Sequence, residues 1–219
     1  KKTNKIIFTG KLNSSKGYDV FGKSIIKILD KHKNWEALAI GNEPREKFNF
    51  KHPNFKILDW VNHKKILKYY NISAISVVPS KWQEPFGRTA MESAAAGCAT
   101  ITSTKGGLPE TFDNKLFINQ VNEDALFKMI NFLIKNKKIR RKHQQFNWKN
   151  VKHKLSDKVK KIDNLKNFYL NTNFNFNKGI KFKILHISTF DERNDHRLFN
   201  ISIANKLTKG FIRNGHDTI

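Results

Sequence analysis

The chain has 219 residues, and its 42 Lys and Arg residues against 18 Asp and Glu give a formal net charge of +24 at pH 7. A hydrophobic fraction of 38% with 18 Phe argues against general disorder, and the single cysteine, Cys98, excludes an intrachain disulfide. No apolar run approaches the roughly 18 residues that a membrane span needs. The positive charge favours nucleic acid, anionic membranes or phosphorylated small molecules as partners, although a genome biased toward Lys and Asn would give the same excess.

The first 136 residues alternate between short apolar runs and stretches with helical spacing. The apolar runs, which predict β-strands, occupy residues 5–10, 37–42, 55–61, 74–80, 99–104 and 115–121. The helical stretches occupy residues 21–32, 63–72, 88–96 and 122–136. Such alternation predicts an α/β fold with a parallel sheet covered by helices on both faces. Ligands of such sheets bind at the carboxyl ends of the strands.

The chain becomes strongly basic after residue 135, and residues 135–170 predict a long helix. Six large apolar residues are candidate anchors of this helix: Phe146, Trp148, Val151, Leu155, Val159 and Ile162. The rest of the basic helix is expected to be a solvated face.

A polar, turn-rich linker is predicted at residues 171–180. A strand, a polar loop, a helix and a second strand then predict the β-loop-α-β opening of another unit at residues 181–219, which is too short to bury its own core. The expected organisation is a first domain at residues 1–170, the linker, and this truncated second unit. Because the chain begins without Met and stops inside a predicted strand, we expect an internal segment of a larger protein.

Glycines, hydroxyls and lysines follow the first predicted strand, in the sequence GKLNSSKG. Gly10 would let the backbone approach a ligand, and Lys11 and Lys16 supply positive charge, so the loop suits a phosphate group. It is neither a Walker A motif nor a GxGxxG motif. The alternative is an exposed, lysine-rich turn.

Two glutamates flank a Pro-Phe-Gly turn after the fourth predicted strand, in the sequence WQEPFGRTAMESAAAGC. The proline after Glu84 disfavours helix at Glu84, which is therefore expected in the loop, while Glu92 lies one turn into the next helix. The amides of Phe86, Gly87 and Arg88 would lie at the amino end of that helix, where anions are favoured. The alternative is that Glu84 caps the helix or pairs with Arg88 and that Glu92 is solvated.

A Gly-Gly turn, Gly106 and Gly107, follows the fifth predicted strand, in the sequence STKGGLPE. A turn of this kind ahead of a proline in the first helical turn is ordinary loop chemistry. It would also let a ligand lie close to the backbone.

Together, the patterns G-K-x4-K-G, E-P-F-G-x4-E and G-G-L-P-E resemble the nucleotide-binding C-terminal half of retaining GT-B glycosyltransferases of the glycosyltransferase-4 type. VVPSKWQEPFGRTAMESAAAGC is similar to the E-x7-E region of that family, and the resemblance runs from about residue 5 to residue 165. It implies a Rossmann-like parallel sheet. It also implies transfer of a hexosyl group, with retention, from a nucleotide-sugar to a glycan or lipid-linked acceptor.

The same resemblance implies roles for the residues around the Pro-Phe-Gly turn. Glu84 would hold hydroxyls of the donor sugar and help stabilise the positive charge that develops on the sugar ring during catalysis. The backbone amides of Phe86, Gly87 and Arg88 would approach the sugar-diphosphate. Glu92 would accept hydrogen bonds from the ribose hydroxyls.

The glycine and lysine residues complete this implied donor site. Lys16 would neutralise the diphosphate and take part in catalysis, and Gly10, Gly106 and Gly107 would come close to the donor. Lys11 stands where the family usually has Arg, so positive charge is kept but the planar fork that binds phosphate through two hydrogen bonds is lost.

No metal site is predicted, because the sequence has no Asp-x-Asp motif and no clustered His and Cys. We therefore expect metal-independent transfer with no cofactor other than the nucleotide-sugar donor.

Residues 181–219 resemble the opening of a second GT-B N-terminal domain. The expected location is the cytoplasm, with peripheral contact to an anionic membrane through the basic helix. The alternative function is a basic nucleic-acid-binding module, but the chain has no recognisable nucleic-acid-recognition motif.

Overall fold

The computed structural model describes residues 2–111, 116–171, 183–184 and 217–218. Its contacts divide the chain into two compact units, Lys1–Ile162 and Asp163–Ile219. The expected domain limits at residues 170 and 181 remain a prediction, because the linker and most of the second unit lie outside the described residues.

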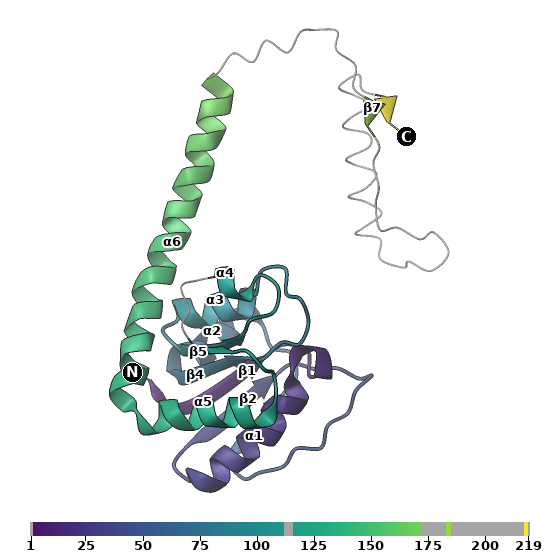
Figure 1. Ribbon diagram of the computed structural model, residues 1–219, viewed down its shortest axis with the longest axis vertical. Helices are drawn as coiled ribbons and strands as arrows, with labels where there is room; N and C mark the ends of the chain where they lie inside the picture. The colour runs from purple at the N-terminus through teal and green to yellow at the C-terminus, as the bar shows by residue number, and fades with distance from the viewer. Residues whose placement is uncertain (1, 112–115, 172–182, 185–216, 219) are drawn as a thin grey trace. The chain divides into compact units, whose positions relative to one another are not determined.

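The first unit is built on a six-stranded parallel sheet of order β3-β2-β1-β4-β5-β6 (Figure 1). Its strands are β1 (Thr3–Thr9), β2 (Glu36–Ile40), β3 (Phe55–Leu58), β4 (Ser73–Val78), β5 (Ala99–Ser103) and β6 (Phe117–Ile118). The predicted parallel sheet is confirmed. The strand order reverses between β1 and β4, which is the point where open α/β sheets bind ligands.

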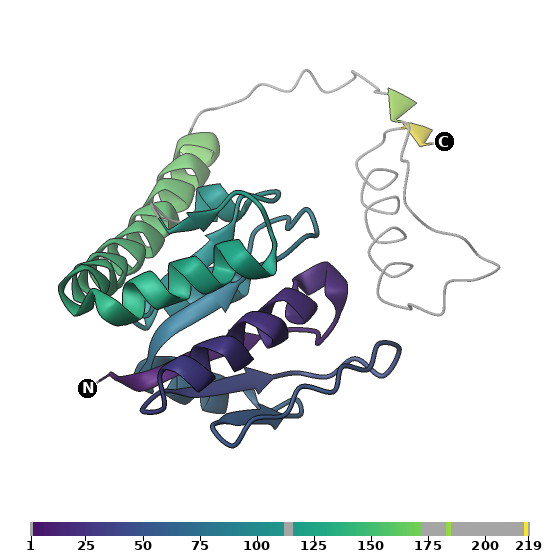
Figure 2. The ribbon, with the colours of Figure 1, turned by 60° about the horizontal axis from the view of Figure 1, so that its bottom comes forward.

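Helices cover both faces of this sheet, as predicted. The described helices are α1 (Tyr18–Lys31), α2 (His63–Ile72), α3 (Arg88–Ala95), α4 (Leu108–Thr111), α5 (Glu123–Lys135) and α6 (Lys137–Asn171), with a short 3-10 turn, η1 (Ser14–Lys16). Helices α1 and α5 lie side by side on one face (Figure 2). Helices α2 and α3 pack together on the other face.

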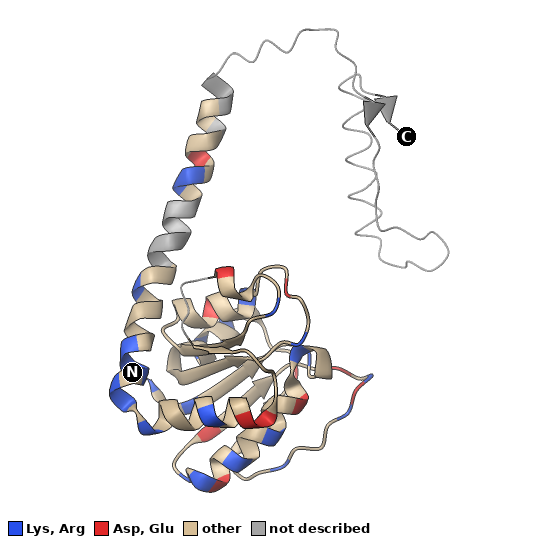
Figure 3. Cartoon of the chain, in the orientation of Figure 1, with Lys and Arg blue, Asp and Glu red and all other residues tan. Residues whose placement is uncertain are grey.

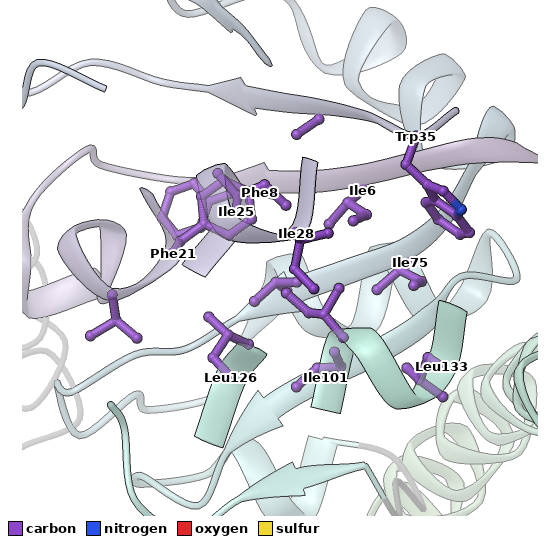
Figure 4. Close-up of a cluster of buried hydrophobic side chains, with 14 of the residues drawn as sticks. Ile6, Phe8, Phe21, Ile25, Ile28, Trp35, Ile75, Ile101, Leu126 and Leu133 are labelled. Atoms are coloured by element: carbon purple, nitrogen blue, oxygen red, sulfur yellow. The ribbon is translucent and has the colours of Figure 1, made fainter. Parts of the chain in front are cut away.

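The alternation of side chains along β1 explains this two-sided core. Ile6 and Phe8 belong to the cluster under α1 and α5, together with residues such as Phe21, Ile25 and Leu126 (Figure 4). Ile7 points to the opposite face, where it packs with Tyr70 of α2. Each Ile, Leu or Phe that is fully buried in this way stabilises the fold by roughly 1.5–3 kcal/mol.

The connection between β2 and β3, residues 41–54, contains no helix although it joins two parallel neighbours. Aromatic side chains cover α1 in its place. The rings of Phe48 and Phe50 stack with centroids 5.6 Å apart, and both meet Tyr18 edge-on. Gly22 gives room for this contact, because a Cβ there would lie 2.1 Å from a ring atom of Phe50.

Helix α6 confirms the predicted long basic helix but not its anchors. Val151 is buried, whereas Phe146, Trp148, Val159 and Ile162 are 38%, 52%, 56% and 64% exposed, so the anchor prediction is wrong for these four. The side chain of Leu155 lies outside the described residues.

The inward face of α6 is polar in its first turns, which the apolar pattern does not indicate. The guanidinium of Arg140 donates hydrogen bonds to the Leu133 and Ile134 carbonyls at the end of α5 and lies over the Trp35 ring. Gln144 and Asn147 donate to carbonyls at the amino ends of β4 and β5. The helix therefore crosses the amino edge of the sheet, opposite the edge where ligands bind.

Beyond the end of α6, the second unit is described only by β7 (Lys183–Ile184) and β8 (Asp217–Thr218), which pair in parallel. The predicted β-loop-α-β opening stays a prediction, because its loop and helix lie outside the described residues. Within the described part of the chain, no helix is long and apolar enough to cross a membrane.

Candidate donor-binding site

A cavity of about 310 Å³ opens at the carboxyl ends of β1 and β4, where the strand order reverses. Six of the predicted site residues line it: Gly10, Lys16, Glu84, Phe86, Gly87 and Arg88. The predicted residues Lys11, Glu92, Gly106 and Gly107 are not among its lining residues.

Lys16 and Glu84 form an ion pair in this cavity. The Nζ atom of Lys16 lies 2.6 Å from Oε1 of Glu84, and Ser80 donates a hydrogen bond of 2.9 Å to the same oxygen. The two side chains are 30% and 14% exposed. The alternative pairing of Glu84 with Arg88 is wrong, because Arg88 contacts Glu92 instead. A cation and a carboxylate thus meet where the family resemblance implies a phosphate group and a sugar.

The amino end of α3 opens into the same cavity. Gly87, the residue before the helix, has φ 79° and ψ 51°, and no side chain caps the first amides. This left-handed conformation favours glycine, and a Cβ at Gly87 would lie 2.5 Å from Cδ2 of Leu108, so the Leu108 side chain would have to shift. The free amides and the helix dipole favour an anion at this position.

Glu92 lies one turn along α3 and is not solvated, contrary to the alternative interpretation. Its Oε1 atom is 3.3 Å from Nη2 of Arg88 and 3.1 Å from Nε2 of His63, and its side chain is 16% exposed. His63 begins α2, which packs against α3. No local pattern around His63 predicts this contact, because it depends on how two helices pack.

Gly106 and Gly107 contact the loop that carries Glu84. Gly107 N donates to the Glu84 carbonyl at 2.6 Å, and Gly106 N donates to the side chain of Gln83 at 2.6 Å. A Cβ on Gly106 would lie 2.4 Å from the Glu84 carbonyl oxygen. The glycines thus permit a close backbone approach that supports Glu84, and their direct contact with a donor stays a prediction.

The loop after β1 is fixed by its own polar groups. Asn13 Oδ1 accepts hydrogen bonds from Lys16 N and Ser15 Oγ, both at 3.0 Å. Gly17, at φ 73°, ends the 3-10 turn. Lys16 therefore points into the cavity from a defined turn, whereas Lys11 is exposed.

Two acids from the connection between β2 and β3 reach this loop, and sequence patterns did not indicate them. Glu46 accepts two hydrogen bonds from Ser14. Glu43 accepts from Asn13 and forms a two-bond pair with Arg45. Hydrogen bonding by Arg45 lowers the pKa of Glu43 to about 2. The only available signal is the position of both acids just after a buried strand, in GNEPREKF.

No group of three or more His, Cys, Asp or Glu residues that could hold a metal ion occurs among the described residues. Metal-independent chemistry nevertheless remains a prediction.

The profile of the family described as glycosyl transferases group 1 matches residues 1–150. The chain belongs to this family. The first unit is therefore a group 1 glycosyl transferase domain, as the resemblance implied. The finer assignment to glycosyltransferase family 4 and the nature of the second unit stay predictions.

Two curated proteins are similar to part of this chain. The chain is 30% identical over 121 residues to spore coat protein SA of Bacillus subtilis, covering 49% of this chain and 32% of that protein. It is 27% identical over 119 residues to 2-deoxystreptamine N-acetyl-D-glucosaminyltransferase of Niallia circulans, covering 51% and 30%. The chain thus spans about a third of the length of these curated relatives.

The fold matches a solved domain of the same family. The C-terminal domain of a glycosyl transferase group 1 family protein from Francisella tularensis superposes with a TM-score of 0.61 at 25% identity. The match covers 69% of this chain and 85% of that domain. The Rossmann-like sheet of this group 1 transferase therefore corresponds to a known glycosyl transferase domain.

Proposed function

We propose that the first unit is the donor-binding half of a GT-B glycosyltransferase. The reaction is transfer of a hexosyl group from a nucleotide-sugar to a glycan or lipid-linked acceptor, with retention and without a metal. The observation that carries this proposal is the Lys16–Glu84 pair beside the uncapped amino end of α3. Family membership makes glycosyl transfer the favoured chemistry and does not favour the nucleic-acid alternative.

The geometry suits a sugar-diphosphate placed across the cavity. The α3 amides and Lys16 would receive the diphosphate, and Glu84 would receive sugar hydroxyls. Glu92, held by Arg88 and His63, would receive the ribose. Cleavage of the sugar–phosphate bond builds negative charge on the leaving phosphate, which Lys16 and the amides stabilise. A charge pair at 4 Å is worth about 4 kcal/mol at an effective dielectric of 20.

The acceptor is proposed to bind between this unit and an acceptor-binding half, which the described residues do not include. The segment alone is therefore expected to bind donor weakly and to turn over little or none. The proposed tandem arrangement with a second glycosyltransferase rests on residues 181–219.

A panel of UDP-, GDP- and ADP-sugars tests the donor site by thermal shift. At millimolar concentration, at least one ligand is expected to raise the melting temperature by about 2 °C or more, because ligand binding stabilises the folded state. Glu92→Ala is expected to lose most of this shift, since it removes the proposed ribose acceptor. The shift should persist at high salt, whereas nucleic-acid binding falls steeply with salt. Failure of every nucleotide-sugar to shift the wild-type protein would contradict the proposal.

We also propose that α6 contacts the inner face of an anionic membrane. Figure 3 shows Lys and Arg along the first turns of this helix. Lys138, Lys142 and Lys149 share one exposed face at helical spacing, next to the half-exposed Ile139 and Phe146. A basic face bordered by apolar side chains suits the headgroup region of an anionic bilayer.

Sedimentation with vesicles tests this contact. The wild type is expected to sediment with phosphatidylglycerol vesicles and not with phosphatidylcholine vesicles, because each lysine near an anionic surface contributes about 1 kcal/mol. Reversing Lys138, Lys142 and Lys149 to Glu should weaken binding by at least tenfold. Reversing three exposed lysines of the β2–β3 region, Lys47, Lys51 and Lys56, makes the same change in net charge away from α6. Equal losses in both triple variants would argue against α6 as the contact.

A further inference from the structure

The helix-free connection between β2 and β3, residues 41–54, does more than join two strands. Its acid Glu46 accepts hydrogen bonds from the backbone N and the Oγ of Ser14, at 2.9 and 2.6 Å through one carboxylate oxygen. Its acid Glu43, whose side chain is 4% exposed, accepts from Asn13 at 3.3 Å. Hydrogen bonds to a carboxylate are shorter and stronger than those between neutral groups.

These contacts continue to the lysine of the donor site. Asn13 accepts from the backbone N of Lys16, two residues after Ser14. On its other side, the turn is fixed by the Ser15 carbonyl, which accepts from the backbone N atoms of Lys81 and Trp82 at 2.9 and 3.0 Å. The turn therefore lies between the acids of one connection and the loop that leads to the site carboxylate.

The turn has little rigidity of its own. Its 3-10 segment is three residues long, and two backbone hydrogen bonds close it, from Gly17 N to Ser14 O and from Tyr18 N to Asn13 O. Short 3-10 turns have poorer hydrogen-bond geometry than α-helices. The direction of the Lys16 side chain therefore depends on the side-chain contacts around the turn.

Glu43 and Glu46 carry a negative charge close to a proposed diphosphate site, so their position there needs an explanation. A carboxylate near a diphosphate site raises the local negative potential and opposes anion binding. Neither Glu43 nor Glu46 lines the cavity, so neither is placed to receive the donor. Their position is accounted for by the hydrogen bonds that they accept from the turn.

We propose that Glu46, supported by Glu43, is a positioning residue of the donor site. It fixes the turn at Ser14 so that Lys16 points at the diphosphate. The inference rests on the proposed donor-binding function, and it assigns to the β2–β3 connection a role in donor affinity.

Electrostatic attraction alone and a positioning role predict opposite changes in anion affinity when the charge of Glu46 is removed. Removing the charge of Glu46 should strengthen anion binding if only Coulomb attraction matters. It should weaken anion binding if the carboxylate positions Lys16. Ser14→Ala sharpens the distinction, because it removes a donor to Glu46 without changing any charge. Coulomb attraction alone predicts no effect for that variant.

The test is calorimetric titration with inorganic pyrophosphate, which probes the diphosphate subsite without knowledge of the base, followed by UDP, GDP and ADP. We expect Glu46→Ala to weaken pyrophosphate binding by roughly tenfold, about 1.4 kcal/mol. Glu46→Gln, which keeps one acceptor oxygen, should lie between it and the wild type, and Ser14→Ala should weaken binding a few-fold. Glu36→Ala is the control. It removes an exposed acid at the amino end of β2 that pairs with Lys5, and it should change pyrophosphate affinity by less than about twofold.

Melting temperatures and amide exchange separate positioning from general destabilisation. Titrations are run well below the melting temperature of every variant, and exchange at the Ser14 and Lys16 amides should rise in Glu46→Ala. Unchanged or tighter pyrophosphate binding in both Glu46→Ala and Ser14→Ala overturns the positioning role alone. A wild-type protein that binds neither pyrophosphate nor any nucleoside diphosphate overturns the donor-binding function itself, and the inference with it.

Discussion

Replacing Gly17 with Ala is expected to lower the melting temperature by about 10 °C. Gly17 has φ 73°, and a Cβ there would lie 1.9 Å from the Pro79 carbonyl oxygen and 2.8 Å from its carbon. Both atoms belong to the backbone after β4 and cannot rotate away. The strain of the left-handed conformation and the forced displacement together cost about 3 kcal/mol. In a protein of this size each kcal/mol lowers the melting temperature by roughly 2–4 °C.

Gly97→Ala is the matched control, measured by the same thermal unfolding followed by circular dichroism. Gly97 has nearly the same backbone conformation, with φ 76°, but its added Cβ would find the nearest atom at 3.5 Å, an ordinary contact. Only the backbone strain remains, so a loss of about 1 kcal/mol is expected. Equal losses for the two variants would show that the loops after β1 and β4 do not approach as closely as described.

The close approach at Gly17 explains how the site is assembled. The loops after β1 and β4 are neighbours because the sheet order reverses between these strands. Without a side chain at position 17, their backbones come close enough for Lys16 and Glu84 to pair. The same geometry would bring a phosphate and a sugar of one donor within reach of both loops.

Much of this arrangement follows from sequence patterns. Apolar runs alternating with amphipathic stretches determine the parallel sheet, and the rule that ligands bind at the carboxyl ends then selects the loops of Gly10, Lys16, Glu84 and Gly87. These residues line one cavity, as predicted. Their convergence is predictable in part, because the carboxyl ends of parallel strands lie at one edge of the sheet. The strand order that makes β1 and β4 neighbours comes from the structure and was not predicted.

Contacts between distant side chains were not predictable in the same way. Glu46 meets Ser14 across 32 positions of sequence, and Glu92 meets His63 through the packing of two helices. No periodic pattern encodes such pairs. Similarly, the sequence of the Gly-Gly turn is compatible with a ligand contact and with the close approach of a neighbouring backbone. Only the structure shows that the Glu84 backbone approaches closely at Gly106.

Helix α6 shows a related difficulty. Large apolar residues predict a buried stripe, yet Phe146 and Trp148 are exposed while Arg140 and Asn147 are buried. The helix packs across the amino edge of the sheet and the end of α5, where free carbonyl groups need donors. Polar side chains that satisfy those carbonyls therefore determine the phase of the helix.

Lys16 and Glu84 are expected to affect nucleoside diphosphate binding in opposite directions. Lys16→Met removes the cation and should weaken binding by roughly thirtyfold, about 2 kcal/mol. This is half of the value for a charge pair at 4 Å, because Lys16 is partly exposed and its charge is partly screened. Glu84→Gln should strengthen diphosphate binding by roughly threefold, because Lys16 no longer has to leave a carboxylate partner.

Glu84→Gln should have a different effect on the part of the affinity that the donor sugar contributes. If Glu84 receives sugar hydroxyls, Glu84→Gln should reduce the additional affinity of a nucleotide-sugar over the corresponding nucleoside diphosphate, even as the diphosphate itself binds more tightly. Calorimetric titration of both ligands measures this difference. Lys11→Met serves as the control, since Lys11 carries the same charge in the same loop but does not line the cavity, and it should weaken binding only a few-fold. Equal losses in the two lysine variants would show that general attraction, rather than the placement of Lys16 beside α3, binds the diphosphate.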